Sequence, residues 1–180
     1  MNSNNNYHKE LIKSINCLNT LELKKAKNKF IATCKASNFI FCCGNGGSAS
    51  ISNHFQVDAL KGIYERRKIK SKFISLSSNI ETITAISNDI GYDKIFEYQL
   101  KIYSKKNKDL LICISSSGNS KNIINAITYA KKNKIFTISL TGFDGGLAAK
   151  LSDISLHIKS DNYGVIEDTH QSIMHYITQV

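Results

Sequence analysis

Two short loops rich in glycine and serine are the most informative stretches of the sequence. "GNGGSAS" (44–50) follows the apolar run 38–43, and "SSSGNS" (115–120) follows the apolar run 110–115. Glycine lets backbone N–H groups approach a ligand closely, and hydroxyls beside a helix N-terminus favour an anion. The GxxxxGK[ST] pattern is absent, so the loops suit a phosphate monoester and predict no nucleotide cofactor.

A second set of residues has the chemistry of proton transfer. His54 and Asp58 are spaced i, i+4 and share one face of a predicted helix. Glu167 and His175 both belong to the last predicted helix or its N-terminal turn. Moving a proton between adjacent carbons of a sugar needs a base at the carbon and an acid at the oxygen, without a redox cofactor. If the last helix closes the same pocket, Asp58 is the candidate base and His175 the candidate acid.

Each feature also has an ordinary structural interpretation. A glycine loop can be a tight turn, and Ser48 or Ser50 can cap the following helix. His54 and Asp58 can form an exposed helix pair, and His175 can be a core histidine. The presence of two such loops at strand ends in one small domain favours the functional interpretation.

The elements that must position these residues alternate along the chain. Short apolar runs are typical of strands buried on both faces of a parallel sheet, and the five runs are 38–43, 72–76, 110–115, 135–141 and 154–158. Segments with helical periodicity separate or follow them, at about 49–61, 79–87, 93–105, 120–132 and 165–179. This alternation predicts a doubly wound α/β fold, in which ligands bind at the carboxyl ends of the strands.

The chain of 180 residues predicts one domain. Residues 1–36 are expected to form a helical segment that packs on the domain and on an oligomer, and residues 37–180 the domain itself. No apolar run approaches the roughly 18 residues of a membrane-spanning helix, and the polar start lacks the apolar region of a secretory signal. We therefore expect a cytoplasmic protein with no membrane partner.

The cysteines and the charge add little about function. The five cysteines have no CxxC or Cys/His spacing, and we interpret them as buried free thiols: Cys17, Cys34, Cys42, Cys43 and Cys113.

The net charge of +10 favours either a solvated basic surface or attraction of anionic small molecules. A nucleic-acid binder is the alternative that charge alone suggests, but no basic stripe with interleaved aromatic residues supports it, and we expect no specific nucleic-acid partner.

The loops and several further motifs resemble the sugar isomerase (SIS) domain family, and within it the phosphoheptose isomerases. The motifs, in the order of the family, are "CGNGGSAS", "AISNDIGYDKIF", "ISSSGNS", "SLTGFDGG" and a final helix with a histidine. The resemblance implies a five-stranded parallel sheet flanked by helices, with a flavodoxin-like order and an N-terminal helical extension. It also implies a homotetramer with sites shared between subunits, and conversion of sedoheptulose 7-phosphate to a heptose 7-phosphate for surface-polysaccharide heptoses, in lipopolysaccharide or capsule.

The resemblance also assigns roles to residues. The phosphate group would be held by Ser48, Ser115, Ser117 and Ser120. The same pocket would be lined by Ser116 and the backbone of Asn45, Gly46 and Gly47, and Asn88 and Asp89 would contact sugar hydroxyls. His54 and His175 match the two family histidines, whereas Asp58 stands in place of a glutamate and Glu167 in place of a glutamine.

A zinc site follows from the same positions. Some phosphoheptose isomerases place zinc among the positions that match His54, Asp58, Glu167 and His175. Two imidazoles and two carboxylates are a reasonable set of ligands for Zn²⁺. In the competing interpretation, Glu167 faces solvent or pairs with a lysine.

The resemblance leaves one functional alternative open. Some relatives with this domain bind the bacterial replication initiator and catalyse nothing. The presence of Asp58 and His175 favours an enzyme over such a non-catalytic phosphosugar-binding protein.

Overall fold

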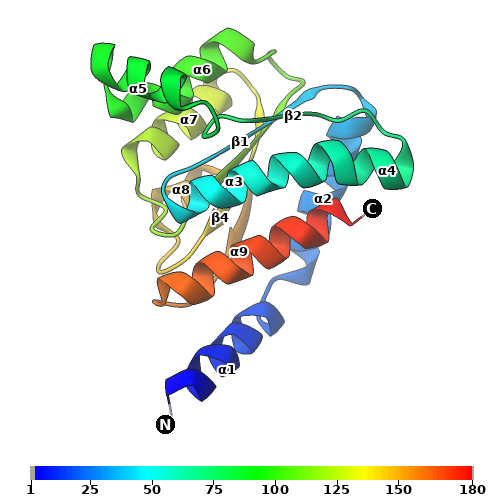
Figure 1. Ribbon diagram of the computed structural model, residues 1–180, viewed down its shortest axis with the longest axis vertical. Helices are drawn as coiled ribbons and strands as arrows, with labels where there is room; N and C mark the ends of the chain where they lie inside the picture. Colours follow the sequence, from blue (N-terminus) through cyan, green and yellow to red (C-terminus); the bar gives the residue numbers. More distant parts are fainter. Residues whose placement is uncertain (1–2, 180) are drawn as a thin grey trace.

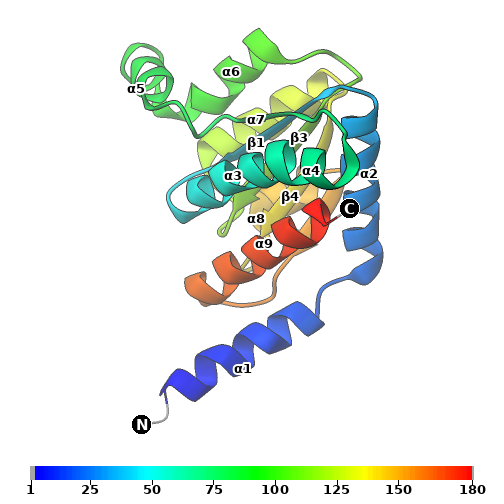
Figure 2. The same ribbon diagram turned by 45° about the vertical axis from the view of Figure 1, so that its right-hand side comes forward.

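A single parallel sheet of five strands organises the chain (Figures 1 and 2). This computed structural model describes residues 3–179, with side chains from residue 6 onward. The strands coincide with the five predicted apolar runs: β1 (Phe39–Gly44), β2 (Lys72–Ser75), β3 (Leu110–Ser115), β4 (Phe136–Thr141) and β5 (Ile154–His157). Their order is β2-β1-β3-β4-β5, which confirms the predicted doubly wound, flavodoxin-like fold.

The strand order places the two glycine and serine loops side by side. From β1 the chain first builds β2 on one side and then returns to build β3 on the other, so the direction of winding reverses there. β1 and β3 pair in parallel, with Gly44 opposite Ile114 at the carboxyl ends. The loops that leave this edge run in opposite directions, which opens a crevice where ligands bind in such sheets.

Helices cover both faces of the sheet. The described helices are α1 (Ser3–Asn16), α2 (Thr20–Lys35), α3 (Gly47–Val57), α4 (Ile63–Arg67), α5 (Ile80–Asp89), α6 (Ile95–Tyr103), α7 (Lys121–Lys132), α8 (Gly146–Leu151) and α9 (Tyr163–Thr178). Successive strand residues point to opposite faces, so Ile112 packs with α2, α3 and α9, whereas Leu111 packs with α6 and α7. Figures 1 and 2 both show α3 and α9 lying next to each other on one face.

The start of α3 differs from the expected serine cap. The residue before the helix is Gly46, and no side chain caps the first turn. Gly46 has a φ of 53°, a left-handed conformation that glycine adopts without strain. The helix therefore begins two residues earlier than a Ser48 cap would place it, and Ser48 lies inside the first turn of α3. The prediction that Ser48 or Ser50 caps this helix was wrong.

The helix after the first loop is also longer than predicted. We expected it to end near residue 61, but it continues through a π-helical turn, η1 (Asp58–Gly62), and through α4 to Arg67. Single π-helical turns inside helices occur frequently at functional sites. Asp58 is the first residue of this turn.

The N-terminal helices differ in how they pack. Phe30 of α2 is fully buried in the core beneath the sheet. α1 projects from the body (Figures 1 and 2) and is held to α9, where Tyr7 Oη donates a hydrogen bond of 2.6 Å to Asp168 Oδ2. Four cysteines are buried free thiols as expected, but Cys17 is exposed, because it follows α1 where the chain has left the core.

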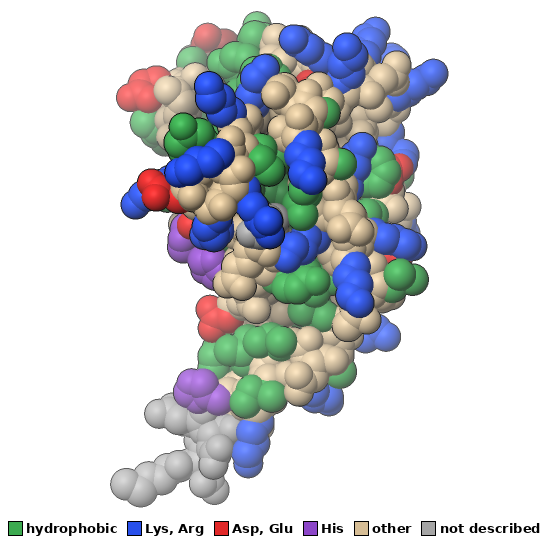
Figure 3. Space-filling view, turned by 90° about the vertical axis from the view of Figure 1, so that its right-hand side faces the viewer, with side chains coloured by type: hydrophobic (Ala, Val, Ile, Leu, Met, Phe, Trp, Pro, Cys, Tyr) green, Lys and Arg blue, Asp and Glu red, His purple; other side chains and the backbone are tan. Residues whose placement is uncertain are grey.

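The chain carries a net charge of +10, and part of that charge lies on the face of the molecule drawn in Figure 3. Figure 3 shows Lys and Arg side chains scattered among other residues over one face of the molecule. Across residues 3–179, no helix combines the length and the apolar character that crossing a bilayer requires.

Candidate active site

A small polar pocket lies at the carboxyl ends of β1 and β3. Its volume is about 170 Å³, and it is lined by Asn45, Ser48, Ile114, Ser115, Ser116, Ser117, Ser120, Tyr163 and Glu167. Both predicted anion loops contribute to it, together with the start of α9. The structure thus brings together seven of the predicted substrate-binding residues, and it adds Ile114 and Tyr163.

The first loop presents its backbone to this pocket. A Cβ atom at Gly47 would overlap the Glu167 carboxylate, so a larger residue at this position would force the Glu167 side chain to move. The first amides of α3 have no partner within the helix, because the N-terminal N–H groups of a helix precede the first helical hydrogen bond. Free amides and the adjacent Ser48 hydroxyl can therefore bind a phosphate oxygen.

The second loop is a tight turn held by its own backbone. The Gly118 amide donates to the Ser115 carbonyl over 3.0 Å, and Gly118 has a φ of 65° and packs against the backbone of Gly145. Ser120 precedes α7, and its hydroxyl makes no capping bond there. Ser117 and Ser120 both line the pocket, and the Ser117 hydroxyl also accepts a hydrogen bond of 3.3 Å from the Asn119 amide.

An amide network fixes the first loop to the rest of the domain. The side chains of Asn45 and Asn122 donate to each other over 2.9 Å in both directions. Tyr92 Oη donates a third bond to Asn45 Oδ1, also over 2.9 Å. Sequence reasoning missed Asn122 and Tyr92, because they come from separate segments and no local spacing connects them to Asn45.

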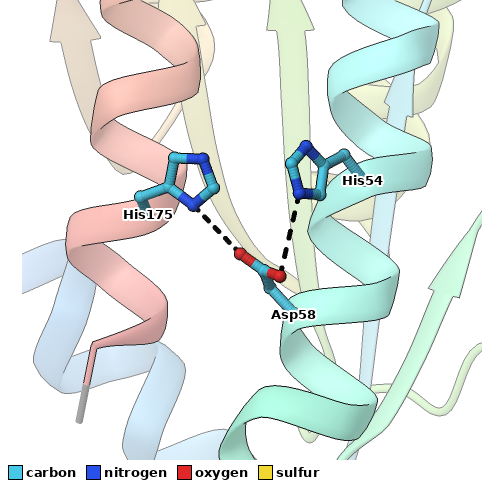
Figure 4. Close-up of side chains that lie close together, drawn as sticks. All are labelled: His54, Asp58 and His175. Atoms are coloured by element: carbon cyan, nitrogen blue, oxygen red, sulfur yellow. Dashed lines mark hydrogen bonds and ion pairs between the residues drawn. The ribbon is translucent and has the colours of Figure 1, made fainter.

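A cluster of two histidines and one aspartate lies between α3 and α9. Asp58 Oδ2 is 3.0 Å from His175 Nδ1, and Asp58 Oδ1 is 3.8 Å from His54 Nε2. Figure 4 shows the carboxylate pointing between the two rings, whose centroids are 5.1 Å apart. Three of the four predicted proton-transfer residues, His54, Asp58 and His175, therefore converge, as required if α9 closes the site.

The donor set of this cluster fits a divalent cation. One ligand atom from each of the three residues lies within 4.8 Å of the other two. Two imidazoles and a carboxylate are the ligands of many zinc sites that keep an open position. The structure does not bring Glu167 into this group but places it in the serine pocket, so its role as a metal ligand stays a prediction.

Gln171 is the polar neighbour of the cluster that sequence reasoning missed. Its Nε2 lies 2.8 Å from His54 Nδ1 and 3.1 Å from His175 Nε2. The spacing could have revealed it, because Gln171 stands four residues after Glu167 and four before His175 on the same helix face.

The pocket and the cluster are the two ends of one polar path. Glu167, Gln171 and His175 recur every four residues along α9, from the serine pocket to the cluster. Eight residues of α-helix span about 12 Å. A polar ligand of that length can therefore contact both ends.

Asn88 and Asp89 do not line the pocket in a single chain. They end α5, both are exposed, and Asn88 Nδ2 donates to Asp89 Oδ1 over 2.8 Å. Their predicted contact with sugar hydroxyls stays a prediction.

Known proteins share both the sequence and the fold. The SIS domain family matches residues 5–142. The phosphoheptose isomerase of Aliarcobacter butzleri is 39% identical over 96% of this chain and 90% of the relative, and that of Helicobacter pylori strain 26695 is 40% identical over 94% and 88%. The chain belongs to the SIS domain family and, within it, to the phosphoheptose isomerases. The structure of a phosphoheptose isomerase from Francisella tularensis superposes with a TM-score of 0.89, at 29% identity, over 97% of this chain and 91% of that one.

Membership confirms the resemblance drawn from the loops. The family match includes both anion loops and ends at Gly142, within the "SLTGFDGG" motif. The match to the Aliarcobacter butzleri relative covers 96% of this chain and therefore includes most of α9. The aldose–ketose isomerase class of this SIS domain protein therefore rests on nearly the whole chain and not on one motif.

Proposed function

We propose that the protein converts sedoheptulose 7-phosphate to D-glycero-D-manno-heptose 7-phosphate, in the cytoplasm, for the heptose of surface polysaccharides such as lipopolysaccharide or capsule. One observation carries the proposal: a phosphate-sized pocket and a His/Asp cluster lie at opposite ends of a path of about 12 Å along α9. That length is of the order of an extended seven-carbon sugar phosphate. The curated relatives of similar sequence support the same reaction.

The serine pocket binds the phosphate end of the substrate. Hydroxyls of both loops and the free amides of α3 donate hydrogen bonds to the phosphate oxygens. Glu167 and Asn45 accept or donate bonds to sugar hydroxyls nearest the phosphate. The remaining carbons extend along α9 toward the cluster.

Asp58 and His175 then move the proton. The Asp58 carboxylate removes the proton from the carbon next to the carbonyl, which produces an enediol. His175, 3.0 Å from Asp58, protonates the carbonyl oxygen and later accepts the hydroxyl proton of the neighbouring oxygen. Return of the proton from Asp58 to the adjacent carbon completes the exchange of ketose and aldose.

A zinc ion is the cation that this site would hold. His54, Asp58 and His175 are the ligands that the structure brings together. The ion would polarise the sugar carbonyl and orient its oxygens.

The active unit is a homotetramer in which a neighbouring subunit completes each site. In one chain, the exposed end of α5 leaves Asn88 and Asp89 available to a neighbour. This explains why two predicted substrate contacts lie outside the pocket of their own chain.

An isomerase assay tests the proposed function. Purified protein is incubated with sedoheptulose 7-phosphate, and the aldose product is followed by NMR. Wild-type protein and the Asp161→Asn control, which alters an exposed aspartate far along the chain from Asp58, should both form the product. No turnover by wild-type protein, with and without added zinc, would contradict the proposal.

A further inference from the structure

Gln171 completes a ring of polar contacts around the two imidazoles. Its amide nitrogen faces His54 Nδ1 at 2.8 Å and His175 Nε2 at 3.1 Å. Asp58 faces the other nitrogen of each ring, at 3.0 Å from His175 Nδ1 and 3.8 Å from His54 Nε2. Each imidazole therefore lies between a carboxylate and an amide, with a different ring nitrogen directed at each.

The hydrogen-bond donors and acceptors of these four residues can all be paired when no cation is bound. A neutral imidazole has one N–H and one lone pair, and the amide NH₂ group has two hydrogens to donate. If both ring N–H groups point at Asp58, the lone pairs of His54 and His175 accept the two amide hydrogens of Gln171. Every contact then pairs a donor with an acceptor.

A cation between Asp58 and the rings reverses the pattern. The ring nitrogens that face Asp58 would give their lone pairs to the cation, so the ring hydrogens would move to the nitrogens that face Gln171. A half-turn of the amide exchanges its NH₂ group for its oxygen, which has two lone pairs. Metal-bound histidines commonly donate their other N–H group to such an oxygen, which fixes the orientation of the ring.

Glu167 is less suited to orienting the two histidine rings. Its carboxylate lies against Gly47 in the serine pocket, and it stands two helical turns from His175. Gln171 lies between them and contacts both histidines directly.

We propose that Gln171 is a positioning residue that orients His54 and His175 for a divalent cation and reverses its amide when the cation binds. The inference rests on the proposed function in that it assigns the cation to the same cluster. It gives the supporting role to Gln171 and leaves Glu167 to the substrate.

Zinc titration of the metal-free protein by calorimetry tests the proposal without measuring activity. Gln171→Leu, which removes both amide groups, should weaken zinc binding by about 10–100-fold, the usual effect of removing such a partner. Gln171→Glu keeps two oxygen acceptors and should bind zinc as tightly as wild type or more tightly. The control Gln179→Leu makes the same change at an exposed position just beyond α9 and should change nothing.

Two outcomes of the titration would overturn the proposal. One is wild-type affinity in Gln171→Leu. The other is a loss in Glu167→Gln as large as that in Gln171→Leu, which would make Glu167 the supporting residue. Absence of zinc binding by wild-type protein would also overturn it, while leaving the isomerase assay free to succeed.

The tautomers of the histidines give a second measurement on wild-type protein. In ¹⁵N NMR spectra, metal-free protein should show the hydrogen on Nε2 of His54 and on Nδ1 of His175. Zinc should move both hydrogens to the opposite nitrogens. Unchanged tautomers after zinc addition would contradict the proposal, even if Gln171→Leu failed to fold.

Discussion

Serine side chains at the carboxyl ends of β1 and β3 line the proposed phosphate end of the site. Their positions follow from backbone turns that place them at the pocket, and not from contacts with charged side chains. They should therefore bind substrate and transition state equally, because the phosphate does not change during the reaction.

The first prediction concerns these hydroxyls. Ser117→Ala combined with Ser120→Ala should raise KM strongly and leave kcat nearly unchanged, because uniform binding is lost. Each hydrogen bond to a charged group contributes about 1.5–3 kcal/mol. Steady-state kinetics with sedoheptulose 7-phosphate measure both constants, and an unchanged KM would exclude the two serines from the phosphate site.

The second prediction concerns the base. Asp58→Asn should lower kcat by about 10²–10⁴-fold, the usual contribution of a general acid–base group, and leave binding of the phosphate end intact. Asp58→Glu restores the residue of the family. It tests whether the active site of this chain requires the shorter side chain of aspartate. Wild-type turnover by Asp58→Asn would remove Asp58 from the reaction.

Helix α9 is the element that joins the two ends of the site. One face carries Glu167, Gln171 and His175 toward α3, and the opposite side packs on the sheet through residues such as Ile173 and Ile177. Burial of that second face fixes the rotation of the helix, and thereby the direction of the functional side chains.

A buried histidine makes the packing of α9 sensitive to pH. His170 is fully buried, and within the described part of the chain neither ring nitrogen has a hydrogen-bond partner. Burial lowers the pKa of His170 from its ordinary 6.5 to about 4, although the Thr141 backbone acts in the opposite direction. The folded protein therefore holds His170 neutral, whereas the unfolded chain takes up a proton below its ordinary pKa.

The third prediction follows from this difference. Stability contributed by neutral His170 is complete above pH 6.5 and is lost as the pH falls toward 4. Between about pH 7.5 and about pH 5, wild type should lose about 2 kcal/mol more unfolding free energy than His170→Leu, which has no such group. Urea unfolding at equal chain concentration measures the difference, and parallel losses in the two proteins would show that His170 titrates normally.

At the scale of the whole molecule, apolar side chains gather on helices α5 and α6. Ile80 and Ile90 flank α5 with exposed fractions of 62% and 50%, and Ile102 on α6 is 64% exposed. The two helices contact each other. Apolar regions of this kind mark contacts between proteins, which supports the proposed tetramer.

The fourth prediction tests this region. Ile102→Glu places a charge in the proposed contact and should convert the tetramer to smaller species in sedimentation experiments, because a buried unpaired charge is costly. The control Lys106→Glu adds the same side chain at an exposed polar position nearby and should leave the tetramer intact. A monomeric wild type, or a tetramer that tolerates Ile102→Glu, would contradict the proposed assembly.

The sequence by itself determined the sheet and most of the phosphate pocket. Each strand is a continuous apolar run, because both faces of a parallel sheet are buried, and the pattern is therefore visible without tertiary information. The two loops follow β1 and β3 directly, and local backbone geometry is enough to bring their serines to the pocket. Local chemistry was sufficient for these parts, although it misjudged the cap of α3, where a left-handed glycine replaced a serine.

Only the tertiary structure decided which side chains meet across elements. Tyr92 reaches Asn45 from a separate segment, and Gln171 joins two histidines because α3 and α9 pack side by side. The rotation of α9 that places Glu167 against Gly47, and not in the histidine cluster, is set by burial of the opposite helix face. Spacing along a chain shows which residues share a face, but the partner of that face depends on how whole elements pack around the core.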